Sequence, residues 1–151
     1  MGFLPKGTIV TNSAHVIYEA EAWIFGIVSS LMHMIWVKAI GGQLETRIRY
    51  SALVCYNTFP IPELTEKQKL GIQQHVLNIL EERETHAVKT MAELYDPEKM
   101  PAGLKEAHHN LDIAVDRCYR SRPFTSDEER LEYLFRLYKA MISGENPQGE
   151  L

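Results

Sequence analysis

The sequence predicts a mostly helical protein of mixed α+β class. Short β-strands and one buried helix are expected on the N-terminal side, followed by an antiparallel helical bundle. Three observations predict this fold. An apolar run covers residues 22–37, polar and apolar side chains alternate over residues 43–50, and beyond Pro62 the apolar residues recur at intervals of three and four.

The apolar run predicts the buried helix. It holds sixteen consecutive uncharged residues, fewer than the ~20 that a membrane-spanning helix needs. Ser29, Ser30 and His33 lie near its middle. A helix that is apolar on nearly all sides is usually buried inside protein. We therefore expect no membrane contact, and we expect Gly41-Gly42 to end the helix.

The alternation predicts a strand over residues 43–49 with two different faces. Its polar face consists of Gln43, Glu45, Arg47 and Arg49, and its other face of Leu44, Thr46, Ile48 and Tyr50. Further short strands are expected at Leu53–Tyr56 and near Thr8–Thr11. This is too little sheet to be stable alone, so it must pack against helices.

The spacing beyond Pro62 predicts three longer helices and one short one. Thr65 with Gln68 forms a capping box, and so does Thr125 with Glu128. The apolar stripes that follow the helical period are Ile72, Val76, Ile79 and Leu80; Val88, Met91, Ala92 and Tyr95; Leu104, His108, Leu111, Val115 and Cys118; and Leu131, Leu134, Phe135, Tyr138, Met141 and Ile142. Short loops between such helices favour an antiparallel bundle.

These patterns divide the chain into residues 1–62, a helical unit over residues 63–144 and a flexible tail over residues 145–151. A chain of 151 residues can bury a sizeable core without disulfides. Cys55 and Cys118 both lie in apolar patterns, so we expect reduced thiols in a cytoplasmic protein. No secretory signal pattern opens the sequence.

The net charge of −4 is unevenly distributed. Residues 1–62 hold four basic and three acidic side chains, whereas residues 63–151 hold twelve and seventeen. DNA phosphates are neutralised by clustered Lys and Arg, which an acidic helical unit does not supply. A nucleic-acid contact is therefore expected in residues 1–62.

No motif in the chain predicts chemistry of its own. There is no glycine-rich phosphate loop and no strong metal-binding pattern, so no catalytic, cofactor-binding or metal-ligating residue is predicted. A histidine and carboxylate cluster consists of His108, His109, Asp112 and Asp116. A solvated helix face with one half-buried histidine, and with Asp116 paired to Arg120, explains this cluster better than a metal site.

Five stretches resemble the C-terminal end of MmeI-like restriction–modification enzymes of type IIG/IIL, which are large DNA methyltransferases. They are Phe25–Trp36, Gly41–Ser51, Tyr56–Pro62, Leu94–Pro101 and Ala107–Asp116. Motifs of this length in this order are more specific than a lone glycine pattern. Asn57-Thr58-Phe59-Pro60 differs from the Asn-Pro-Pro-Phe/Tyr motif of the amino-group methyltransferases, because Thr58 replaces the first proline.

The resemblance implies that residues 1–62 are the last part of a target recognition domain and that the rest is a C-terminal helical domain. It implies a parent enzyme that methylates adenine N6 within a short DNA site, with S-adenosylmethionine as its cofactor. The nuclease and the methyltransferase core of such enzymes are not in these 151 residues. We therefore expect a fragment that binds no cofactor, has no catalysis of its own and acts together with the remaining methyltransferase domains on double-stranded DNA.

Within this resemblance, strand 43–49 is a candidate for reading bases. Outward side chains two residues apart on a strand are separated by ~6–7 Å, which suits neighbouring base pairs in a major groove. Arg commonly binds guanine and Glu can accept from the cytosine amino group. The candidate DNA-binding residues are Glu45, Arg47 and Arg49 on bases, and Lys38 and Lys6 on phosphates. From the residues alone, a solvated edge strand with a Glu45–Arg47 pair explains the same pattern.

A function of another class stays open, namely a non-catalytic module for protein interaction or dimerisation. Large apolar side chains in the run 22–37 have to be covered, because an exposed patch of that size promotes association. They are Trp23, Phe25, Ile27, Met34 and Trp36. We expect either the helical bundle or a second copy of the chain to cover them.

Overall fold

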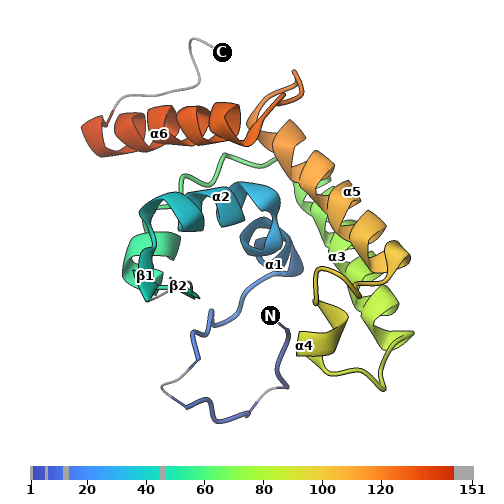
Figure 1. The fold of residues 1–151 in the computed structure, drawn as a ribbon. Helices are drawn as coiled ribbons and strands as arrows, with labels where there is room; N and C mark the ends of the chain where they lie inside the picture. The colour runs from blue at the N-terminus through green and yellow to red at the C-terminus, as the bar shows by residue number, and fades with distance from the viewer. Residues whose placement is uncertain (1, 6, 12–13, 45–46, 145–151) are drawn as a thin grey trace.

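Helices make up most of the computed structural model, which describes residues 2–5, 7–11, 14–44 and 47–144 (Figure 1). The elements are α1 (Ala22–Ser29), α2 (Leu31–Ile40), β1 (Gly42–Leu44), β2 (Arg47–Arg49), the π-helix η1 (Ala52–Tyr56), α3 (Glu66–Glu84), α4 (Met91–Leu94), α5 (Ala102–Tyr119) and α6 (Asp127–Ser143). Helices α3 and α5 lie side by side, α1 packs against them, and α6 lies across α2.

The expected α+β class is wrong, because helices supply nearly all of the core. Within the described residues, strands occur only as one antiparallel hairpin of two three-residue strands, which forms no layer of the fold. Leu53–Tyr56, expected as a strand, lies in the π-helix η1. Residues 7–11 contain no strand. A short apolar run fits a buried strand and a helical turn equally well, and here the helical turn is formed.

The buried run forms two helices rather than one. Ser30 has extended backbone, with ψ of 161°, and its hydroxyl caps α2 by accepting from the His33 N–H. The same hydroxyl donates to the Ile27 carbonyl at 2.7 Å. Because Ser30 ends α1 and begins α2, the two helices are bent by 55°. Among the described helices, none alone is long and apolar enough to cross a membrane, and α1 with α2 passes that test only as this bent pair.

One hydrophobic core joins the two parts of the chain that the sequence separates at residue 62. Its buried members on the N-terminal side are Phe25, Ile27, Met32, Trp36 and Phe59, and they pack against buried side chains of α3, α5 and α6. Helix α1 approaches α3 closely at Gly26, because a β-carbon there would overlap Ile72 Cγ2. The helical unit therefore covers most of the apolar run, as one of the two expectations had it, although Met34 stays 45% exposed.

The expected antiparallel bundle is wrong in its placement of α6, because this helix packs on α2. The ring of Trp36 lies 5.2 Å from that of Phe135 and 5.5 Å from that of Tyr138. A buried ion pair between Asp116 and Arg130, at 2.7 Å, joins α5 to α6. The expected Asp116–Arg120 pair is therefore wrong, because Asp116 is 92% buried and pairs across the helices instead of along its own helix.

Helix caps follow the sequence closely at α3 and less closely at α6. The Thr65–Gln68 capping box is present in both directions. At α6 the N-cap is Ser126 rather than Thr125, and its hydroxyl accepts from the Glu129 N–H at 3.2 Å. Cys55 and Cys118 are both free thiols, as predicted.

Candidate nucleic-acid interface

The candidate base-reading segment is a hairpin that follows α2 directly. Gly42 pairs with Arg49, and Leu44 pairs with Arg47. The expected single strand over residues 43–49 is therefore wrong, because the chain reverses between Leu44 and Arg47. A single strand at this surface would leave its backbone groups without partners, whereas the hairpin lets its two halves bond to each other.

The structure places some of the candidate residues and leaves others outside its description. Arg49 is exposed at the end of β2, and Lys38 is exposed in the last turn of α2. Arg47 begins β2, but its side chain lies outside the described part. Glu45 and Lys6 lie outside the described residues altogether. Of the two exposed cations, Arg49 therefore lies in the hairpin itself and Lys38 on the helix that precedes it.

Three polar contacts join α2 to the segments that follow it. The Gly41 N–H donates to the Val37 carbonyl at 2.8 Å and caps the end of α2. Tyr50 immediately follows β2, and its hydroxyl lies 3.2 Å from His33 Nε2. The third contact is farther along the chain, where Trp36 Nε1 donates to Thr58 Oγ1 at 3.2 Å. The segments on both sides of η1 are thus attached to the same helix.

Burial keeps the His33–Tyr50 contact neutral. Desolvation lowers the pKa of His33 to about 4. Desolvation also raises the pKa of Tyr50 to about 12, with smaller contributions from Cys55 and Tyr56. Near neutral pH the contact is therefore a hydrogen bond between an uncharged imidazole and an uncharged phenol. Sequence reasoning noted His33 but assigned it no role; its signal was a lone polar ring in an apolar run.

The segment Asn57-Thr58-Phe59-Pro60 serves the core. The Thr58 hydroxyl accepts from Trp36 and donates to the Val54 carbonyl. The ring of Phe59 is 96% buried and meets His33 edge-on, with centroids 4.6 Å apart. An aromatic ring that stacks on a flipped base has to be accessible, so Phe59 is not placed for that purpose.

The histidine and carboxylate cluster of α5 is divided among structural contacts. His108 Nε2 lies 2.8 Å from the Tyr95 hydroxyl, and Asp112 accepts from the Leu31 N–H at 2.7 Å. Asp116 binds Arg130. In the described part of the chain, no group of three or more His, Cys, Asp or Glu side chains is placed to hold a metal ion.

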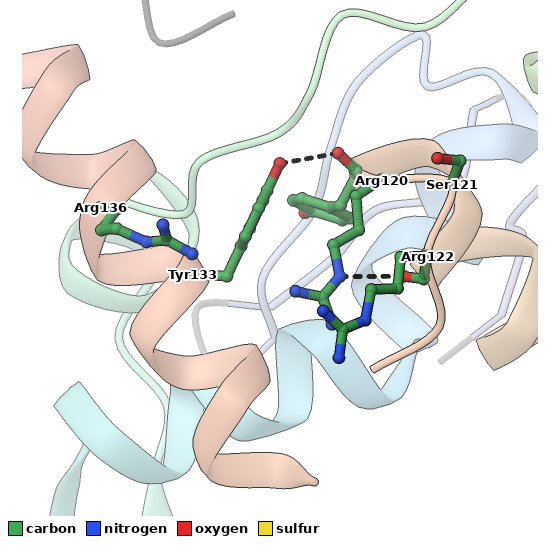
Figure 2. A pocket seen from close by; sticks show the side chains of 6 residues that line it. Arg120, Ser121, Arg122, Tyr133 and Arg136 are labelled. Atoms are coloured by element: carbon green, nitrogen blue, oxygen red, sulfur yellow. Dashed lines mark hydrogen bonds between the residues drawn. The ribbon is translucent and has the colours of Figure 1, made fainter. Parts of the chain in front are cut away.

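A pocket of about 420 Å³ lies at the corner between α5 and α6 (Figure 2). Its Arg120 is already engaged, because it donates to the carbonyls of Arg122 and Pro123 and binds Glu129 at 2.6 Å. Figure 2 shows the Tyr133 ring between Arg120 and Arg136, and its hydroxyl donates to the Tyr119 carbonyl at 2.8 Å. These contacts join α5 to α6, and the pocket lies outside the candidate DNA-binding segment.

Comparison with known proteins identifies both parts of the chain. Residues 1–63 match the family model of the MmeI target recognition domain, and residues 64–144 match that of the MmeI C-terminal domain. The chain belongs to the MmeI family. It is 52% identical over 141 residues to DNA methyltransferase A of Bacillus subtilis (strain 168). That alignment covers 93% of this chain and 16% of the relative.

The fold of this MmeI-family chain also matches a solved structure. The Type IIL restriction-modification enzyme MmeI, solved in complex with DNA, superposes with a TM-score of 0.79 at 42% identity. The match covers 83% of this chain and 17% of that enzyme. The chain thus spans about a sixth of the length of these relatives, and it comprises their recognition and C-terminal domains.

Proposed function

We propose that this chain recognises double-stranded DNA through the β1–β2 hairpin, on behalf of a methyltransferase that modifies adenine N6. Catalysis and the binding of S-adenosylmethionine belong to other domains of the whole polypeptide. The observation that carries the proposal is an arginine-bearing hairpin within the segment that matches a target recognition domain. The relative MmeI was solved in complex with DNA, which supports the same function.

The hairpin suits recognition of bases because it carries two arginines on a strand that is attached to α2. Arg49 is exposed, and Arg47 precedes it by two residues on β2. Arg can bind guanine through two hydrogen bonds in the major groove, and each such contact is worth about 1–3 kcal/mol of discrimination. Glu45 is the proposed partner of a cytosine amino group. Lys38 is the proposed phosphate contact, since it is exposed on the helix that precedes the hairpin.

Binding of a fluorescent DNA duplex by the purified chain tests this function. Affinity should fall as salt rises, because bound phosphates release counterions. R47A/R49A should weaken binding of a preferred sequence by at least about 10-fold, whereas Lys38→Ala should weaken all sequences alike and lower the salt slope by about one unit.

The matched control is R117A/R122A, which removes the same charge from two exposed positions, Arg117 in the last turn of α5 and Arg122 in the loop that follows. This variant should bind the DNA duplex nearly as tightly as the unmodified chain. Equal losses in the two double variants would reduce the effect to net charge, and the absence of salt-dependent binding would contradict the proposed function. Self-association in place of DNA binding would favour the interaction-module alternative.

A further inference from the structure

The β1–β2 hairpin is attached to α2 at both of its ends. β1 begins at Gly42, directly after the capped end of the helix. β2 ends at Arg49, and the next residue, Tyr50, bonds back to His33 in the first half of the same helix. The first attachment is the continuous chain itself, whereas the second depends on two side chains.

His33 is an unusual residue for the place it occupies. It is 97% buried among the apolar side chains of α2, and in the described part of the chain its Nδ1 has no hydrogen-bond partner. Burying a polar atom without a partner costs free energy, and an apolar side chain of similar size would avoid that cost. Within the described residues, the only hydrogen bond of the His33 ring is the one to Tyr50. The ring therefore contributes something that close packing alone does not.

A hydrogen bond contributes direction. Apolar contacts stabilise the base of the hairpin over many orientations, whereas a hydrogen bond weakens steeply when its geometry changes. The Tyr50 ring also lies 5.5 Å from the His15 ring, but the directional contact is the hydrogen bond between its hydroxyl and His33. We infer that His33 and Tyr50 are positioning residues that fix the angle of β2, and with it Arg47 and Arg49, relative to bound DNA. This inference rests on the proposed function of the hairpin.

The chain contains a second pair of the same chemistry that serves as a matched control. The Tyr95 hydroxyl lies 2.8 Å from His108 Nε2 and accepts from Arg83 Nε at 2.7 Å. Tyr95 directly follows α4, and α4 lies on the opposite side of the view from the hairpin (Figure 1). Tyr50→Phe removes a hydroxyl that bonds to the buried His33, and Tyr95→Phe removes one that bonds to the half-buried His108. Of the two tyrosines, only Tyr50 lies beside β2.

Hydrogen exchange measures the positioning without DNA. Tyr50→Phe should raise the exchange rates of amides in residues 42–49 by about 3- to 10-fold, as expected for loss of one hydrogen bond, and leave α3 and α5 unchanged. Tyr95→Phe should leave the hairpin rates as they are in the parent chain. Unchanged hairpin rates in Tyr50→Phe, or an equal rise in both variants, would overturn the positioning role.

The double variant H33L/Y50F separates positioning from stability. Replacing both partners of a hydrogen bond by apolar groups is nearly neutral for folding, so its urea midpoint should match that of the parent chain. Its preference for the best sequences in a randomised duplex library should still fall by about 3- to 10-fold. Retained preference would overturn the inference. If R47A/R49A also retained the preference of the parent chain, the proposed function itself would fail.

Discussion

Gly26→Ala tests whether the recognition segment and the C-terminal segment share one core. The added methyl group would overlap Ile72 Cγ2 and would lie 3.1 Å from Val76 Cγ2 and 3.3 Å from Leu111 Cδ1. All three neighbours belong to the C-terminal segment and are at least 99% buried, so none can turn towards solvent. Helix α1 would have to move away from α3 and α5.

The expected loss follows from two opposing effects. Overpacking a filled core costs about 1–3 kcal/mol. Replacing glycine by alanine inside a helix returns about 0.8–1 kcal/mol. Because three immobile side chains crowd the site, we expect the upper part of the overpacking range and a net loss of about 1–2 kcal/mol in the free energy of unfolding.

Gly71→Ala is the matched control, because Gly71 is an exposed position inside α3 with no atom close to an added β-carbon. This variant should gain about 0.5–1 kcal/mol from helix propensity alone. Urea denaturation followed by circular dichroism measures both changes. If Gly26→Ala were as stable as Gly71→Ala, the close approach of α1 to α3 would be refuted. A transition in tryptophan fluorescence at a lower urea concentration than the transition in circular dichroism would show that the two segments unfold separately.

Three further predictions concern pH, the buried ion pair and catalysis. Burial lowers the pKa of both His33 and His108 to about 4, whereas the rings of the unfolded chain bind protons below about pH 6.5. The contribution of these neutral rings to the free energy of unfolding is therefore complete above pH 6.5 and is lost as the pH drops from 6.5 towards 4. Urea midpoints that do not change over this pH range would contradict this. Asp116→Ala removes the partner of Arg130 on α5 but leaves its contact with Asp127, so it should cost about 1–3 kcal/mol in the same assay, whereas a loss within experimental error would show the pair to be unimportant. The chain alone should transfer no tritiated methyl group from S-adenosylmethionine to DNA, and incorporation above a blank would disprove this.

The sequence predicted most helices because their signals are local. The Thr65–Gln68 capping box and the apolar stripe behind it define α3 within a few residues. It did not predict the hairpin, since the alternation of polar and apolar residues continues through the reversal between Leu44 and Arg47. A period of two carries no information about where a strand turns back.

The sequence also did not predict contacts between residues that lie far apart along the chain. Asp116 and Arg120 have the spacing of a helical ion pair, but Asp116 binds Arg130, fourteen residues away. The direction of α6, which decides this pairing, comes from the packing of Trp36 against Phe135 and Tyr138. Arg49 and Lys38 could be proposed as candidates from residue type and position, whereas the contact of His33 with Tyr50 required the structure.

Exchange of charges in the hairpin tests the central proposal, that this segment reads bases, most directly. The variant E45R/R47E keeps composition and net charge, and it alters only the order of the charges on the candidate residues. Selection of preferred sequences from a randomised duplex library, by the parent chain and by this variant, gives the measurement. Base reading predicts a changed preference at one position of the site, by roughly 10- to 100-fold, with the other positions retained. Uniformly weaker binding with the same sequence preference would contradict it.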